Sequence, residues 1–337
     1  MSTQLSPGRS PRQEAWRRFK KNRLAVVFLV VFAFFFVMAL SAQLVEVLQT
    51  LSTEPGSDTS AGPSYQLTLH DMGVQTENGE PFIEGKHPPS GAHWMAWLGT
   101  MTDGKSVLLW VFHGAKVAFA VGALGAGLAV LIGMTLGLLA GFLGGWVDWL
   151  IQYIYSTLAS IPYLLLILAL AFIFKNGDFK EIFNEWWLSD FISLGLFNII
   201  LVIGCTSWVT LCRLVRAEVK KVRELEYIQA ARALGFGNRR ILIRHILPNV
   251  FHLVIINFSL TFVMAIKSEV ILTFLNVGVD VGAEASWGLM IRNAKNELMQ
   301  GMWWPLLGAG GALFLLALAV NYVGDALRDA LDPKLKT

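Results

Sequence analysis

Charged residues are scarce in this sequence. Asp, Glu, Lys and Arg make up only 15% of its 337 residues, whereas a typical soluble domain carries about 25%. The hydrophobic set makes up 55% and the mean hydropathy is +0.55, which excludes an ordinary set of soluble domains. The net charge of +3 is small and gives no support for nucleic-acid binding. Composition therefore predicts an integral membrane protein.

Cysteines and metal-ligand patterns are also sparse. The two cysteines, Cys205 and Cys212, lie seven positions apart in one apolar segment, a spacing that fits neither a disulfide framework nor a Cys-x-x-Cys pair. The six histidines form no pair or cluster at ligand spacing, and the Gly-x-Ser-x-Gly and His-Glu-x-x-His strings are missing. We therefore predict no metal site and no enzymatic activity on this chain.

Long apolar runs are what the sequence has in abundance. Six windows contain no Asp, Glu, Lys or Arg, and each is long enough to cross about 30 Å of hydrocarbon as a helix. Because every backbone amide must be paired inside a bilayer, helices are the economical solution. The expected fold is an all-α membrane protein with six transmembrane helices. The windows are Leu24–Val45, Val117–Val147, Trp149–Phe174, Phe191–Cys212, His245–Ile266 and Leu298–Gly324.

Basic residues collect on one side of this six-span topology. Seven precede the first window, nine lie between the fourth and fifth, and three follow the sixth. Residues 46–103 instead hold eight acidic residues and one basic residue, Lys86. The positive-inside rule then places both termini in the cytoplasm and the long loop outside. We expect a multi-pass protein of the bacterial inner membrane.

Two segments outside the windows carry weaker signals. Residues 1–23 contain Trp16 and Phe19 among basic residues, which fits an interfacial amphipathic helix or a plain topology signal. In the external loop, residues 46–106, the alternation of apolar residues over 65–69 and the pair Asn78-Gly79 predict a small β-hairpin.

Gly99-Thr-Met-Thr-Asp-Gly-Lys-Ser106 matches the phosphate-binding loop literally. That loop works only where a strand delivers it to the start of a helix in an α/β domain. Here a Pro-rich stretch precedes it and a membrane window follows, so we interpret the match as chance similarity.

Small residues recur every fourth position in the second window, at Gly125, Ala129, Gly133, Gly137 and Gly141. They share one helix face, which permits close approach of another helix. The face is either a packing contact at the centre of a translocation bundle or an ordinary helix contact.

The loop between the fourth and fifth windows, residues 213–245, holds the most informative pattern. Residues 226–234 are strong helix formers, and Gly235 and Gly237 end the helix. The order Ala230-Ala231, Gly235 and Ile-Leu-Pro248 resembles the EAA loop of permease subunits of ABC importers. The alternative interpretation is a basic amphipathic loop that binds the surface of anionic lipid.

Other segments resemble the dipeptide/oligopeptide branch of these permeases, end to end along the chain. The branch differs from this chain at Met101 and Gly104–Ser106, at Gln152 and Tyr155, where it usually has Arg and Asp, and at Gln229, where the EAA motif has Glu. The similar segments are Trp97–Thr100, Gly141–Asp148, Pro162–Leu166, Thr273–Gly278, Ser286–Gly288 and Asn321–Pro333.

The resemblance implies a subunit without an ATPase site of its own. A second, non-identical permease completes the pore, two cytoplasmic ATPases bind ATP and Mg, and an external binding protein delivers peptide; no cofactor is expected on this chain. Residues 107–325 are the permease core, residues 326–337 the cytoplasmic tail, and a coupling helix at 226–235 contacts the ATPase. The coupling residues are Glu226, Gln229, Ala230, Ala231, Leu234, Gly235 and Phe236.

Three further groups of charged residues are candidates. Lys267 and Glu269 are a gate or substrate contact, or an interfacial pair. Arg292 and Lys295 are a docking site for the binding protein, a contact for a peptide carboxylate, or solvated charge. We expect a structural ion-pair cluster after the sixth span, formed by Asp325, Arg328 and Asp329 on one helix.

Two rival functions remain at this point. The same class of transporter could carry nickel or another small solute, and a channel or membrane enzyme would work without ATPase partners. The EAA-like loop favours the importer, and uptake competition between peptide and metal separates the cargoes.

Overall fold

The computed structural model describes residues 17, 19–52, 88–90, 94–176, 183, 192–280 and 284–331. These residues are overwhelmingly helical, and within them the only β pairing is an isolated bridge between Thr100 and Ser106. The hairpin predicted within residues 65–83 lies outside the described residues, as does Trp16.

Within the part of the chain that the structure describes, five apolar helical stretches are long enough to cross a membrane. The helix α2 forms the first. Two stretches contain a π-helical turn, at Val121–Gly125 and Leu242–Ile246, and one has a short break between α9 and α10. Their helices are α2 (Arg23–Ser52), α4 (Val107–Ala120) with α5 (Ala126–Leu143), α9 (Leu194–Thr206) with α10 (Val209–Val222), α12 (Asn238–Ile241) with α13 (Leu247–Phe274), and α15 (Trp304–Leu331).

The third predicted span differs from expectation. It consists of α6 (Gly145–Ser160) and α7 (Tyr163–Asn176), which meet at an angle of 94°, so a straight helix over 149–174 is wrong. Pro162 has no N–H to continue the helical ladder. Ile161 is pushed into an extended conformation with φ −91° and ψ 132°, as a residue before proline prefers. Counted as one span, the bent pair brings the total to six.

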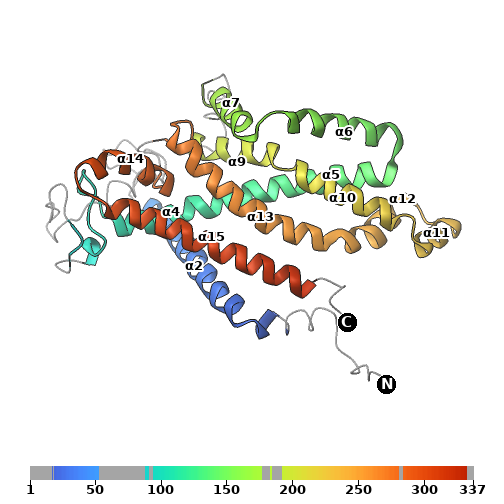
Figure 1. Cartoon of the computed structure of the whole chain (residues 1–337), viewed down its shortest axis with the longest axis horizontal. Coiled ribbons are helices and arrows are strands. Elements are labelled where there is room, and N and C mark those ends of the chain that lie inside the picture. Colours follow the sequence, from blue (N-terminus) through green and yellow to red (C-terminus); the bar gives the residue numbers. More distant parts are fainter. Residues whose placement is uncertain are drawn as a thin grey trace.

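The glycine-rich face of α5 packs on α10 (Figure 1). A Cβ atom on Gly133 would lie 2.7 Å from the carbonyl oxygen of Trp208, and one on Gly137 would lie 2.8 Å from that of Cys212. A Cβ on Gly141 would meet Val219 at 2.7 Å. Three successive turns of α5 therefore need glycine for the backbones to approach. The predicted small-residue contact is confirmed, and it joins two helices of this chain.

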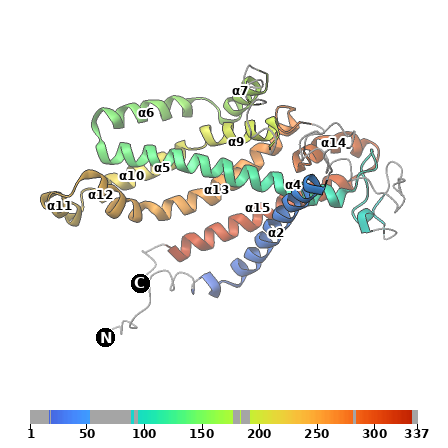
Figure 2. The same cartoon turned by 180° about the vertical axis from the view of Figure 1, so that it is seen from behind.

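The bundle has two distinct ends. The start of α2, the short helix α11 (Glu226–Ala233) and the end of α15 lie toward one end, and α14 (Trp287–Met299) lies at the other (Figures 1 and 2). These three segments contain or adjoin the basic clusters of the sequence. The arrangement agrees with the single-sided charge distribution on which the topology prediction depends.

The stretch before α4 is a tight turn. Met101 N donates to the carbonyl oxygen of Lys105 at 2.9 Å, and Lys105 Nζ pairs with Asp103 at 3.0 Å. The Ser106 hydroxyl accepts from Leu109 N and caps α4. The Lys and Ser that resemble a phosphate-binding loop are therefore engaged within the turn and the helix cap.

Candidate functional site

The helix α11 leaves α10 after a short turn and is attached to the bundle by one face. Ile228 and Ala231 are buried against Val222, Ile241 and Ile246. Because residues three positions apart share a helix face, these two side chains fix the rotation of α11. Of the predicted pair, Ala231 therefore serves attachment, while Ala230 is exposed.

The end of α11 is a complete Schellman cap. Gly235 has φ +79°, a region that L side chains rarely adopt. Gly235 N donates to the carbonyl oxygen of Arg232 at 2.9 Å, and Phe236 N donates to that of Ala231 at 3.1 Å. This pair of backbone hydrogen bonds defines the motif. The chain reverses its direction here, and Leu234 and Phe236 lie on the surface.

The outer face of α11 and its cap is apolar and basic. Leu234 is 76% exposed, and Tyr227 and Phe236 are also exposed. An open cavity of about 560 Å³ follows the cap, lined by Gly235–Gly237, Arg239, Arg240, Ile243 and Arg244. Exposed large apolar side chains beside a basic rim are typical of a protein contact. We call this the α11 surface: Glu226, Tyr227, Gln229, Ala230, Leu234 and Phe236 with the basic residues Arg239, Arg240 and Arg244.

Gln229 has a local role that a carboxylate could not fill. Its Nε2 donates to the carbonyl oxygen of Glu224 at 3.0 Å, and a glutamate at this position has no donor to offer. The side chain therefore stabilises the turn between α10 and α11. This is a physical reason for the departure from the acidic residue of the EAA motif.

A second set of contacts joins α11 to the start of α13. Asn249 Nδ2 donates to the Tyr227 hydroxyl at 2.9 Å and to the carbonyl oxygen of His245 at 2.6 Å. The Phe236 ring stacks on His245 with centroids 6.5 Å apart. Sequence reasoning did not assign these roles to Tyr227, His245 or Asn249, although His245 and Asn249 stand beside the Ile-Leu-Pro248 signal.

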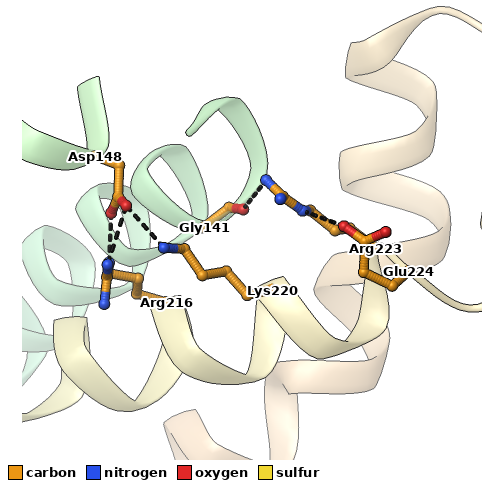
Figure 3. A network of polar contacts seen from close by, with 6 residues as sticks. All are labelled: Gly141, Asp148, Arg216, Lys220, Arg223 and Glu224. Carbon is orange, nitrogen blue, oxygen red and sulfur yellow. Dashed lines mark hydrogen bonds and ion pairs between the residues drawn. The ribbon is translucent and has the colours of Figure 1, made fainter. Parts of the chain in front are cut away.

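A polar network connects α6 to α10 just before α11 (Figure 3). Asp148, in the first turn of α6, accepts hydrogen bonds from Arg216 Nε and Nη2, the latter at 3.0 Å, and from Lys220 Nζ at 2.7 Å. Asp148 is buried, and its two partners lie one helical turn apart on α10. One carboxylate thus holds two cations and fixes α6 to α10.

A separate set of polar contacts lies in the turn before α11. Arg223 Nη1 donates to the carbonyl oxygen of Gly141 at 3.1 Å, and Arg223 Nε donates to Glu224 at 2.8 Å (Figure 3). Because Gln229 bonds to the same Glu224, the end of α5, the end of α10 and α11 are linked by consecutive polar contacts. These contacts connect α11, through the turn before it, to the end of α5.

Asp148→Asn is expected to destabilise the protein by about 1–3 kcal/mol, because it leaves two partly buried cations without their shared carboxylate. The measurement is the thermal unfolding midpoint in detergent. Lys221→Ala is the matched control on the same helix, since its pair with Glu218 is mostly exposed and should contribute less than about 1 kcal/mol. Equal midpoints for the two variants would contradict the role of the network.

The structure separates the residues predicted near the outer ends of the spans. Lys267 is exposed, whereas Glu269 is buried and its Oε1 accepts from Thr273 Oγ1 at 3.0 Å, so the two do not form a pair. Arg292 Nη1 donates to Asn276 Oδ1 at 2.8 Å, and Lys295 is exposed. The gate or substrate contact at Lys267 and Glu269 stays a prediction, as does the docking site at Arg292 and Lys295.

Residues of α14 also hold the loop before α4. Glu297 is buried and accepts from Thr102 Oγ1 at 3.4 Å. Burial raises the pKa of this carboxyl group because the charged form loses solvation.

The cluster expected after the sixth span is not formed. Asp325, Arg328 and Asp329 all lie on α15 with exposed side chains, and among the described residues no ion pair joins them. Exposed pairs gain little energy against solvation and side-chain entropy, so helical spacing alone did not bring these groups together.

Two family models match the chain. One is described as the inner membrane component of binding-protein-dependent transport systems and matches residues 133–337, which include α6, the Asp148 network and α11. The other is described as the N-terminal TM domain of oligopeptide transport permease C and matches residues 10–52.

Similar proteins of known role extend over nearly the whole chain. The dipeptide transport system permease protein DppC of Bacillus subtilis is 32% identical over 98% of this chain and 88% of its own length. The oligopeptide transport system permease protein OppC of Haemophilus influenzae is 29% identical over 97% and 90%. The glutathione transport system permease protein GsiD of Pectobacterium atrosepticum is 30% identical over 98% and 93%.

The fold is also similar to a solved structure. A chain of the MetNI methionine ABC transporter in an inward-facing conformation superposes with a TM-score of 0.51 over 67% of this chain and 98% of that chain, at 15% sequence identity. The helical arrangement of this chain is therefore similar to that of the MetNI chain.

Proposed function

This chain belongs to the family of binding-protein-dependent transport system inner membrane components, and on that premise we propose that it is a permease subunit of an ATP-driven importer of di- and oligopeptides. It forms the translocation pathway together with a second permease in the bacterial inner membrane, with both termini in the cytoplasm. The charge distribution along the sequence supports this orientation.

The observation that carries the proposal is the α11 surface. Three large apolar side chains, Tyr227, Leu234 and Phe236, are exposed at the tip of a helix that has been capped and bonded in place. Burying these side chains against a partner would remove apolar surface from water, which is favourable. A cytoplasmic ATPase with an apolar groove and acidic rim has the complementary chemistry for this apolar and basic surface.

The contacts around α11 suit it to transmit motion. The buried Ile228 and Ala231 attach α11 to the bundle, and the Tyr227–Asn249 bond attaches it to α13. The Asp148 contacts in turn hold α10, which precedes α11, to α6. When the ATPase pair closes on ATP, α11 moves with it. The helices attached to α11 then move too, and the bundle switches between its inward-open and outward-open conformations. ATP and Mg are bound by the ATPases, and nucleotide shifts the equilibrium only by its different affinity for the two states.

The test is to purify the tagged chain gently in detergent and to identify what accompanies it at near-stoichiometric amounts. We expect a second permease and P-loop ATPases. Reconstitution with the binding protein should then give ATP-dependent uptake of peptides.

Two results would contradict the proposal in different ways. A chain that is isolated alone and is active without ATPases would support a channel or membrane enzyme. Uptake that is competed by nickel but not by peptides would retain the importer and change its cargo.

A further inference from the structure

A cavity of about 690 Å³ lies where two spans are interrupted. The break between α6 and α7 at Ile161–Pro162 forms one wall, and the break between α9 and α10 at Ser207 forms another. The middle of α13, from Asn257 to Met264, closes a third side. Interrupted helices within a membrane are tolerated where they line a cavity, and such sites bind the cargo in several transporter folds.

The walls of this cavity are held together by hydroxyl groups. The Tyr163 hydroxyl, at the start of α7, lies 3.2 Å from Ser207 Oγ and 3.3 Å from Ser268 Oγ of α13. This contact joins three helices at the level of both breaks. The volume is within the range of small-ligand sites, which is about 300–1,000 Å³.

Arg213 brings a positive charge to the cavity. It lies on α10 directly after the fourth apolar window, lines the cavity, and has an exposed side chain. Its guanidinium lies 4.8 Å from the ring centroid of Tyr155 on α6, and among the described residues no carboxylate forms an ion pair with it. A charge at the end of a span faces water, a partner or a ligand rather than lipid, because its exposure to lipid is costly.

A second wall of the cavity, the last turn of α6, has negative character. Leu158, Ala159 and Ser160, the last turn of α6, line it. The carbonyl groups at a helix C-terminus carry the negative end of the helix dipole and attract cations. Tyr155, beneath Arg213, precedes Ser160 by five residues, or about 7.5 Å along the helix axis. Two extended residues of a peptide span about 7 Å.

We infer that this cavity is a peptide-binding site within the permease, in which Arg213 binds the C-terminal carboxylate and the last turn of α6 faces the ammonium group. The inference rests on the proposed peptide cargo. Arginine suits this role because its planar fork binds a carboxylate in a bidentate manner.

The experiment compares three forms of one dipeptide in the complete reconstituted transporter: the free acid, the C-terminal amide and the N-acetyl derivative. Initial ATP-dependent uptake is measured for wild type, Arg213→Gln and Arg213→Lys with the same binding protein throughout. Because the binding protein is the same throughout, its selectivity contributes equally to the uptake ratios of all variants. A change in a ratio between variants is therefore caused by the permease.

We expect Arg213→Gln to lower the ratio of acid to amide uptake about tenfold, the effect of losing one charge-assisted hydrogen bond. Arg213→Lys keeps the charge but loses the bidentate fork, so its ratio should lie between those of wild type and Arg213→Gln. The ratio of free to N-acetyl peptide should be unchanged in both variants, since that end of the peptide lies away from Arg213.

Two results overturn the inference. Equal loss of acid and amide uptake in Arg213→Gln would make Arg213 structural, and failure of this variant to assemble would make it a subunit contact. Thr210→Glu offers a second route, because it places a competing carboxylate one turn from Arg213 and should lower the same ratio while Thr210→Gln does not. If wild type takes up no peptide in any form, the proposed cargo itself is wrong.

Discussion

Gly137→Leu is expected to prevent the chain from accumulating as a folded membrane protein. A Cβ atom at this position would lie 2.8 Å from the carbonyl oxygen of Cys212 and 2.8 Å from Val215 Cβ. The first of these is backbone, so it cannot move without displacing α10. Overpacking of a filled core costs about 1–3 kcal/mol, and a whole leucine side chain between two touching helices should exceed that range.

The matched control is Gly127→Leu on the same helix. A Cβ atom there meets nothing within 4 Å, so the side chain can extend away from the bundle. We expect the control to give a monodisperse peak of normal height in fluorescence-detected size-exclusion chromatography, and Gly137→Leu to lose most of that peak. Similar profiles for both variants would show that the glycine contact between α5 and α10 is not required.

Much of the fold could be predicted because its determinants are local or periodic. A four-residue repeat of small side chains predicts a face for close packing, and α5 packs through that face. The bend in the third span was not predicted, although Pro162 lies within the window. Hydropathy measures the length of an apolar run, and a proline in such a run is compatible with a mild kink. The angle of 94° depends on the packing of α7 against α9.

In the candidate site, too, the local features could be predicted from the sequence and the long-range contacts could not. The helix over 226–234 ended by Gly235 was predicted from propensity and capping, and the structure has α11 at Glu226–Ala233 with Gly235 at positive φ. Asp148 was not singled out, because its partner Arg216 lies 68 residues away. Helical spacing shows that Arg216 and Lys220 share a face, but not which carboxylate faces them. In the sequence they contributed only to the charge count.

Gly235→Val should lower transport by the assembled complex at least tenfold while leaving assembly intact. The reason is conformational, since a Cβ atom at Gly235 meets nothing within 4 Å. Its φ of +79° costs an ordinary residue about 1–2 kcal/mol, and a β-branched residue more. The cap should therefore unwind, and Leu234 and Phe236 would leave the positions in which the α11 surface presents them.

Two controls separate this mechanism from a general loss of the loop. Gly235→Asn should keep most of the transport rate, because asparagine tolerates the left-handed region better than other residues. Gly237→Ala should behave as wild type, since Gly237 has an ordinary φ of −62° and open space around it. The readouts are ATP-driven uptake and ATPase stimulation in proteoliposomes containing equal amounts of complex. Normal uptake by Gly235→Val would show that the Schellman cap does not position the coupling contact, and the role assigned to α11 would then be wrong.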